Sequence, residues 1–269
     1  MIGAIAGDMI GSPYEGRPIK SRTFPLFAEN SFFTDDTVLT VAVADALLHN
    51  ESYDSVFRRY GRKYPNAGYG RSFIQWFQSD DAGPYNSLGN GAAMRVAPIG
   101  WFCDSLEAVM QEARKSAEVT HNHPQGIKGA QAVAAAVFLA RKNENFQVIR
   151  PTLVNQFGYD LGRCLKDIRP KYRHDVTCQG SVPEAIIAFL ESTNFEDAVR
   201  NAVSLGGDSD TQAAIAGAIA EAYYGGVPSD IKKQVFTRID KNLQQVVNTF
   251  AKQHMITSPI RSFWRNLLK

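Results

Sequence analysis

Apolar residues recur at every third or fourth position along most of the 269-residue chain, which is the spacing of one face of an α-helix. The alternation of apolar and polar residues that is typical of half-buried strands is nearly absent. The connections between helical segments are short and rich in turn residues, and none is long or polar enough to act as a linker. The pattern therefore predicts an all-α protein made of a single domain over residues 1–269, with helices over 37–49, 105–119, 126–142, 182–192, 195–205, 211–225 and 230–239.

Two of these helices are rich in alanine and glycine. The stretches AQAVAAAV and AAIAGAIA, within 126–142 and 211–225, carry small side chains over most of their surface. Other helices can approach such a surface closely from several sides, so we expect both helices at the centre of the fold. Gly3, Gly7 and Gly11 recur at intervals of four residues, which also favours close helix packing. Neither a dinucleotide-binding nor a P-loop glycine pattern is present.

The stretch SFFTDDTVLT, residues 31–40, places Thr34, Asp35 and Asp36 between two apolar segments. Adjacent carboxylates repel each other, and burying a polar group without a partner costs roughly 2 to 7 kcal/mol. Two explanations are open. Thr34 can cap the helix that follows, with both acids in its first turn favoured by the helix dipole. Alternatively, the acids bind a cation.

A related cluster, LGGDSDT, precedes the helix over 211–225 and contains Asp208, Asp210 and Thr211. Helix dipoles favour such acids but cannot neutralise four of them. Carboxylate and hydroxyl oxygens select Mg²⁺, Mn²⁺ or Ca²⁺ over zinc or copper, and four carboxylates are enough for two divalent ions. An EF-hand calcium loop is excluded, because its sixth and twelfth positions would be Ala213 and Ile219. The matched pair of clusters therefore favours a metal site.

Composition narrows the remaining classes of function. The net charge of +2 is too balanced for a protein whose affinity comes from neutralising many phosphates, so nucleic acid is not an expected partner. The stretch RRYGRKYPNAGYGRSF has the basic and aromatic pattern of single-strand binding, but a solvated helix face running into a loop explains it better.

Membrane and secretion signals are also missing from the pattern. No window offers the roughly 18 apolar residues of a membrane span, and the apolar start has no basic region of a signal peptide. Cys103, Cys164 and Cys178 lack C-x-x-C spacing, which fits reduced thiols. We therefore expect a soluble cytoplasmic protein with no membrane partner, and a monomer.

Six motifs follow one another along nearly the whole chain: GAIAGDMIGSPYEG, FTDDT, the GYG loop, GNGAAMR, THNHP and LGGDSDT. Together they resemble the ADP-ribosylglycohydrolase family, which includes the dinitrogenase reductase-activating glycohydrolases and the ADP-ribosyl-acceptor hydrolases. The resemblance implies an orthogonal multi-helix fold and hydrolysis of the bond between a ribose and an arginine nitrogen or a serine oxygen, with release of ADP-ribose from a modified protein. It also implies two Mg²⁺ or Mn²⁺ ions, held by Thr34, Asp35, Asp36, Asp208, Asp210 and Thr211.

Cleavage of a glycosidic bond needs an oriented sugar, an activated water and a protonated leaving group. Ions can orient the ribose hydroxyls and lower the pKa of a bound water. Asp35 and Asp36 are the candidates for accepting the proton of that water. Glu15, in GSPYEG, resembles a family glutamate near the metals that would serve as acid, gate or water ligand, with a solvated loop position as the alternative.

The resemblance assigns substrate binding to the backbone amides of two loops, where glycine permits close approach to the ligand. The residues are Gly68 and Gly70 in the first loop and Ser87, Gly89, Asn90 and Gly91 in the second.

The adenosine end of the ligand is less well specified by the sequence. Some family members carry an aromatic residue for adenine stacking beside the serine, where this chain has Leu88, and Tyr85 is a weak substitute. His121 either donates to the substrate or packs at the start of the next helix, and His121 with His123 is poor evidence for zinc. Arg95 is predicted to be structural.

Other classes of function stay open. A non-catalytic ADP-ribose-binding protein is expected to lose metal ligands, and none is missing from the two clusters. An immunity protein that neutralises an ADP-ribosylating toxin, and a hydrolase of a non-protein ADP-ribosyl conjugate, are further alternatives. Release of ADP-ribose from a panel of conjugates distinguishes these classes.

Overall fold

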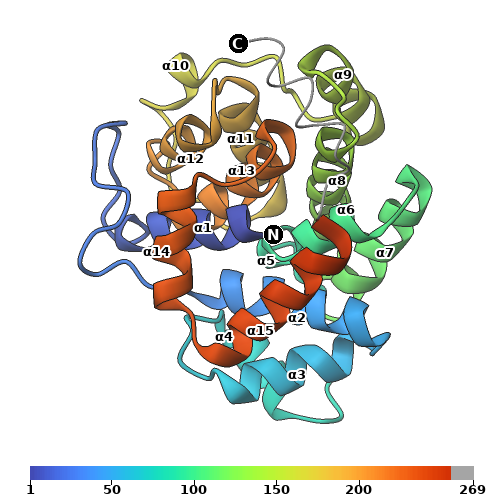
Figure 1. The fold of residues 1–269 in the computed structure, drawn as a ribbon. Coiled ribbons are helices and arrows are strands. Elements are labelled where there is room, and N and C mark those ends of the chain that lie inside the picture. The colour runs from blue at the N-terminus through green and yellow to red at the C-terminus, as the bar shows by residue number, and fades with distance from the viewer. Residues whose placement is uncertain (256–269) are drawn as a thin grey trace.

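The computed structural model describes residues 1–255, and within that range every regular element is a helix, which confirms the all-α prediction. An isolated bridge joins Gly89 to Thr177 without forming a strand. The elements, drawn in Figure 1, are α1 (Ile2–Gly11), η1 (Ser12–Tyr14), α2 (Asp35–His49), α3 (Tyr53–Lys63), α4 (Arg71–Gln78), α5 (Gly91–Met94), α6 (Ala97–Phe102), α7 (Leu106–Glu118), α8 (Pro124–Arg141), α9 (Phe146–Phe157), α10 (Leu165–Ile168), α11 (Cys178–Leu190), α12 (Phe195–Val203), α13 (Ser209–Tyr224), α14 (Ser229–Arg238), α15 (Lys241–Phe250) and the π turn η2 (Ala251–Met255).

The two alanine-rich helices lie at the centre, as the sequence predicts. Every residue of α13 from Ser209 to Ala222 is buried, because α1, α8, α11 and α12 pack around it. α8 in turn contacts α5, α6, α7 and α9. Figure 1 shows the surrounding helices crossing this pair at varied angles. Small side chains on all sides of a helix make such multiple close contacts feasible.

Glycines let α1 pack directly against the backbone of α13, and Figure 1 shows the two helices near the centre of the molecule. A Cβ atom on Gly3 or Gly7 would collide with the backbone carbonyls of Gly217 and Ala213. A Cβ atom on Gly11 would lie 2.6 Å from the Cα of Asp210, at the start of α13. The four-residue glycine spacing therefore serves backbone-to-backbone packing, and it fixes the end of α1 against the second acid cluster.

All seven predicted helices exist, with ends that differ by a few residues. Some of the helices that the pattern missed, although not α3 or α15, are short or locally unfavourable. α9, for example, contains Pro151, and α5 and α10 have only four residues each. These elements depend on packing against neighbours more than on their own sequence.

The basic stretch after Ser55 differs from its predicted role. Arg58 on α3 is buried, with its guanidinium stacked 3.9 Å from the ring centre of Trp76. Its Nη2 donates to the carbonyl of Ala82 at 2.7 Å, and its Nη1 donates to the carbonyls of Trp76 and Ser79. The prediction of a solvated face is therefore wrong at this position: Arg58 ties α3 to α4 and to the chain after it.

Replacing Gly7 by alanine tests the α1–α13 contact. The new methyl group meets the backbone of Ala213, which cannot move aside, so we expect the free energy of unfolding to fall by about 1 to 3 kcal/mol. Urea denaturation followed by circular dichroism measures the change. Gly16→Ala is the matched control, because no atom lies within 4 Å of a Cβ atom there. Equal stability of the two variants would contradict the packing argument.

A carboxylate-lined cavity as candidate active site

All fourteen residues predicted to bind metal or substrate or to act in catalysis line one cavity of about 710 Å³. The starts of α2 and α13 form one part of its lining, here called the floor, and the loops around residues 68, 89 and 121 form another part, here called the wall. The structure thus brings together the predicted set: Glu15, Thr34, Asp35, Asp36, Gly68, Gly70, Ser87, Gly89, Asn90, Gly91, His121, Asp208, Asp210 and Thr211.

The start of α2 is held by an acid that the sequence-based prediction missed. Asp8 is fully buried on α1 and accepts hydrogen bonds from the backbone N–H of Thr34 at 2.9 Å and of Thr37 at 3.1 Å. It also accepts from both threonine hydroxyls, that of Thr34 at 2.8 Å. The signal available in the sequence was a lone acid inside an apolar helix.

Thr34 is the N-cap of α2, and its hydroxyl oxygen accepts from the N–H of Asp36 at 3.2 Å. The capping explanation of this cluster is therefore confirmed. It does not exclude a cation, because the carboxylate of Asp36 reaches past the cap into the cavity: its Oδ2 accepts from the Thr211 hydroxyl at 3.2 Å. That hydrogen bond connects the starts of α2 and α13.

At the start of α13, Asp208 occupies the N-cap position without a capping hydrogen bond from its side chain. Its Oδ2 instead accepts from Nδ2 of Asn90 at 2.7 Å. The same Nδ2 lies 3.1 Å from the hydroxyl of Ser181 on α11. The side chain of Asn90 thus orients an acid of the second cluster, a contact that the sequence did not reveal.

The acids on the cavity floor repel one another. Burial, followed by the charge of Asp8, raises the pKa of Asp35 to about 8. Burial and neighbouring carboxylates also raise the pKa values of Asp36 and Asp210 well above their usual range. Among residues 1–255, no lysine or arginine forms an ion pair with these carboxylates, and Oδ1 of Asp36 has no hydrogen-bond partner.

A hard divalent cation fits this set of donors. Carboxylate and hydroxyl oxygens converge on one space, and one of them is a buried oxygen without a partner. Oxygen atoms of Glu15, Asp208 and Asp210 lie within 4.8 Å of one another. A cation among them would offset the repulsion that raises their pKa values.

A second group of acids makes a useful contrast. Asp45, His49 and Glu51 also bring ligand atoms within 4.8 Å of one another. Arg59 already neutralises this group, with nitrogens 3.0 Å from Asp45 and 2.6 Å from Glu51. An arginine therefore pairs with the acids of that cluster, whereas no lysine or arginine of residues 1–255 forms an ion pair with the acids of the cavity.

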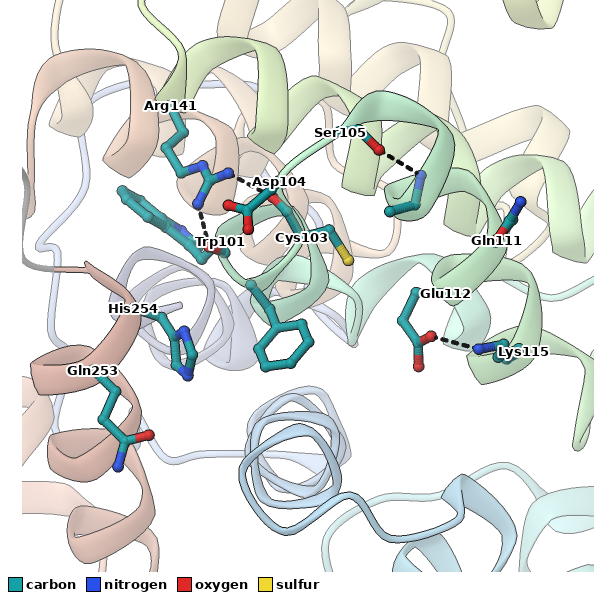
Figure 2. Close-up of a pocket in the computed structure, with 12 residues that line it drawn as sticks. Trp101, Cys103, Asp104, Ser105, Gln111, Glu112, Lys115, Arg141, Gln253 and His254 are labelled. Carbon is teal, nitrogen blue, oxygen red and sulfur yellow. Dashed lines mark hydrogen bonds and ion pairs between the residues drawn. The ribbon is translucent and has the colours of Figure 1, made fainter.

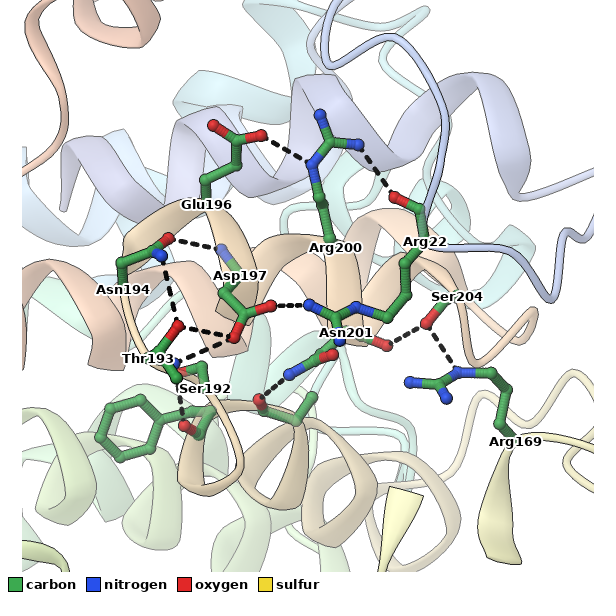
Figure 3. A network of polar contacts seen from close by, with 12 residues as sticks. Arg22, Arg169, Ser192, Thr193, Asn194, Glu196, Asp197, Arg200, Asn201 and Ser204 are labelled. Atoms are coloured by element: carbon green, nitrogen blue, oxygen red, sulfur yellow. Dashed lines mark hydrogen bonds and ion pairs between the residues drawn. The ribbon is translucent and has the colours of Figure 1, made fainter. Parts of the chain in front are cut away.

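The loop that carries Glu15 is attached to α12, as Figure 3 shows for Arg22. Arg22 forms an ion pair with Asp197 on α12. Arg200, from the same helix, donates to the carbonyls of Arg22 at 3.0 Å and Phe24 at 2.7 Å. These contacts fix the loop to α12, and the same loop carries Glu15 beside the second acid cluster.

The cavity wall contains tight turns around Gly68, Gly89 and Gly91. Gly68 has a φ of +101°, which glycine adopts readily, and the neighbouring Ala67 carbonyl accepts from the N–H of Asp35 at 2.7 Å. A Cβ atom on Gly91 would lie 3.2 Å from Nε2 of His121. His121 thus lies in the cavity wall, while His123 serves as the N-cap of α8.

Leu88 is absent from the cavity wall, so stacking on adenine at that position is not available. Tyr85 does line the cavity, with its ring centre 5.9 Å from that of His121. Phe32 and Val176 add two exposed apolar side chains to the same cavity. The apolar surface that an aromatic base requires therefore comes from residues that the sequence motifs do not mark.

A second cavity, of about 720 Å³, lies between α6, α7 and the end of the described chain (Figure 2). Its wall mixes the acids Asp104 and Glu112 with the base Lys115, which pairs with Glu112 at 3.0 Å. None of the predicted site residues belongs to it. Its charges are balanced internally, in contrast to the acid floor of the first cavity.

Fold and site together define an α-helical protein with an acid-lined cavity between two helix starts. The ADP-ribosylglycohydrolase family model matches residues 1–257, and the chain belongs to that family. It is therefore an enzyme that hydrolyses ADP-ribosyl bonds. Between Met1 and Met255, no helix combines the length and apolar character needed to cross a membrane.

Several known proteins are similar to this chain. ADP-ribosylhydrolase ARH3 of Gallus gallus is 30% identical over 311 residues, covering 84% of each chain. ADP-ribosylarginine hydrolase Tri1 of Pseudomonas putida is 26% identical and covers 87% of this chain and 72% of its own. A solved structure described as an ADP-ribosylglycohydrolase-related protein complex superposes with a TM-score of 0.72 at 25% identity, covering 93% of this chain and 96% of that one.

Neutralising one acid tests the repulsion on the cavity floor. In metal-free protein, Asp36→Asn replaces a carboxyl group whose ionisation is disfavoured by burial and by neighbouring acids, so we expect the melting temperature to rise by roughly 2 to 5 °C. Differential scanning calorimetry in EDTA measures it. Asp81→Asn, at an exposed position, is the control and leaves the melting temperature unchanged. A lower melting temperature for Asp36→Asn would show that the acids are not repelling one another.

Proposed function

We propose that this enzyme is a metal-dependent hydrolase that releases ADP-ribose from mono-ADP-ribosylated protein side chains. The observation that carries the proposal is the convergence of two Asp- and Thr-rich helix starts on one cavity, where no lysine or arginine of the described residues forms an ion pair with their carboxylates. Arginine N-linked substrates are favoured, since a similar protein is named an ADP-ribosylarginine hydrolase. Serine O-linked substrates are the second candidate.

Two Mg²⁺ or Mn²⁺ ions are the proposed cofactors. Four carboxylates offer enough negative charge for two divalent ions, and oxygen-only donors suit these two metals. When bound, such ions supply a Lewis acid that orients ribose hydroxyls and lowers the pKa of a water. The residues that would hold them are Thr34, Asp35, Asp36, Asp208, Asp210 and Thr211.

The protein side chains divide the remaining work. Asp35 or Asp36 accepts the proton of the attacking water, because both carboxylates reach the cavity from the start of α2. Glu15 lies beside the second cluster in the same cavity, where it serves as proton donor to the leaving group or as a ligand to water. In inverting glycosidases one carboxyl group protonates the leaving group while the other activates a water on the opposite face of the sugar.

The loops of the cavity wall bind the remainder of the ADP-ribose. Turns with little side-chain cover let backbone amides approach the diphosphate and ribose, and His121 adds a side-chain contact. The residues in this role are Gly68, Gly70, Ser87, Gly89, Asn90, Gly91 and His121. We further propose that the enzyme acts as a monomer and that residues 1–269 form one domain.

Metal binding is tested by calorimetric titration of the metal-free protein with Mg²⁺ and Mn²⁺. We expect binding that Asp208→Ala weakens by about 100-fold or more, because a carboxylate ligand is lost from a shared site. Asp160→Ala, on the exposed segment after α9, is the control and leaves binding unchanged. Unchanged binding in Asp208→Ala would leave the two clusters with a capping role only.

Hydrolysis is tested by measuring ADP-ribose release from arginine-linked and serine-linked peptides, with Mg²⁺, with Mn²⁺ and with EDTA. Asp36→Ala and Asp210→Ala should each lower the rate about 100-fold or more, because positioning and charge stabilisation are lost together. The double variant should be little worse than either single one, since residues acting through a shared centre are not additive. Full activity in EDTA would refute the mechanism, and binding of ADP-ribose without hydrolysis would indicate a binding protein.

A further inference from the structure

Arg95, which the sequence predicts to be structural, is fully buried beside the cavity without a counter-ion. Among residues 1–255, it forms no ion pair, and its Nε and Nη1 have no hydrogen-bond partner. Its Cζ lies 4.3 Å from the ring centre of Phe57, and its Nη2 donates to the carbonyl of Ser116 at 2.7 Å. Burying a cation with so few partners costs free energy of folding, which suggests that Arg95 has a function beyond packing.

The remaining contact of Arg95 leads to the cavity wall. Nη2 donates to Oγ1 of Thr120 at 3.0 Å, and Oγ1 lies 2.7 Å from Nδ1 of His121. A guanidinium nitrogen can only donate, so Oγ1 is the acceptor in the first of these hydrogen bonds. The hydroxyl proton of Thr120 is then free to be donated to Nδ1, and that nitrogen must carry a lone pair to accept it.

The charge of Arg95 favours this direction. The guanidinium lies on the Nδ1 side of the imidazole, across Thr120, so a lone pair at Nδ1 is attracted to it and an N–H bond there is repelled. Burial, and next the charge of Arg95, lower the pKa of His121 well below its usual value. A neutral imidazole with a lone pair at Nδ1 carries its only proton at Nε2.

Nε2 of His121 faces the cavity. It lies against the turn between Gly89 and Gly91, where Cβ atoms would approach it to 3.6 Å and 3.2 Å. Nε2 has no hydrogen-bond partner among the described residues, and the surrounding protein does not bury it completely. A donor at this position is therefore available to a ligand.

We propose that Arg95 and Thr120 are positioning residues that hold His121 in the Nε2–H tautomer, so that the ring presents a fixed N–H donor to an acceptor oxygen of the bound ligand. The inference rests on the proposed binding of ADP-ribose in this cavity. It extends that function by setting the chemistry of one contact: His121 recognises an oxygen that accepts, such as a phosphate oxygen, and not a donor group.

Tyr85 provides the competing arrangement. Burial raises the pKa of Tyr85 to about 12, while the charge of Arg95 and a hydrogen bond with the side chain of Thr120 oppose this rise. If Thr120 donated its proton to Tyr85, His121 would have to donate from Nδ1 to Oγ1 and would present a lone pair at Nε2. The two arrangements predict opposite tautomers, so the state of His121 decides between them.

Long-range ¹H–¹⁵N NMR of histidine-labelled protein, without ligand, reads the tautomer directly. The His121 signals are assigned by their loss in His121→Gln. We expect the Nε2–H pattern in wild type and in Thr120→Ser, which keeps the hydroxyl, and a mixture of tautomers in Thr120→Val and Arg95→Met. An Nδ1–H pattern, or a protonated ring, in wild type at pH 7 overturns the proposal. Where Arg95→Met does not fold, Thr120→Val carries the comparison.

Calorimetric titration with ADP-ribose and steady-state kinetics give the functional readout. Thr120→Val should raise the Kd for ADP-ribose and the KM about tenfold, with kcat changed by less than about twofold, because one binding contact loses its orientation. Thr120→Ser should restore both values. Thr152→Val, on α9 outside the cavity, is the matched control. A Kd that is equal in Thr120→Val and wild type refutes the positioning role.

The two proposals fail separately. If wild-type protein shows the Nε2–H tautomer but neither binds ADP-ribose nor hydrolyses its conjugates, the proposed function is wrong and the arrangement of Arg95, Thr120 and His121 stands. If wild type binds and hydrolyses but has the Nδ1–H tautomer, the proposed function stands and the positioning role is refuted.

Discussion

The site depends on how closely α1 approaches α13. Glycines on α1 allow its backbone to touch the backbone of α13, and Gly11 meets Asp210 at the point where the second acid cluster begins. Asp8 lies on the same helix and holds the start of α2 through Thr34 and Thr37. One helix therefore sets the distance between the two clusters, and a side chain in place of any of these glycines would separate them.

The cavity combines two kinds of preorganisation. On its floor, carboxylates are held close together by hydrogen bonds from Asn90 and Thr211, against their mutual repulsion. On the cavity wall, the ring of His121 is oriented by a hydrogen bond with Thr120 and by contact with the turn between Gly89 and Gly91. An acid floor suited to cations and a wall of hydrogen-bond donors fit a ligand that carries both sugar hydroxyls and phosphates.

The sequence predicted what is encoded locally. Helical periodicity located α8 and α13, and the matched acid motifs identified Asp35, Asp36, Asp208 and Asp210 as neighbours of a helix start. Contacts between distant segments were beyond its reach.

Three such contacts show why. Asp8 can accept its hydrogen bond from Thr34 only when α1 lies against the start of α2. Asn90 can orient Asp208 only when the fold brings its amide within hydrogen-bond distance. Arg58 belongs to a basic stretch that suggests a solvated surface, yet it is buried and donates hydrogen bonds to carbonyls at the end of α4. Each role depends on a partner that no short window of sequence contains.

The contact between the two clusters has a consequence for how the chain folds. Thr211 and Asp36, joined by a hydrogen bond, are 175 positions apart, and Gly3 reaches Glu221 across 218 positions. Bringing such distant segments together is entropically slow, and during synthesis α1 must wait for α13 to leave the ribosome. A truncated or half-made chain has one acid cluster without the other. The complete set of acids therefore forms only after most of the chain has been made and folded.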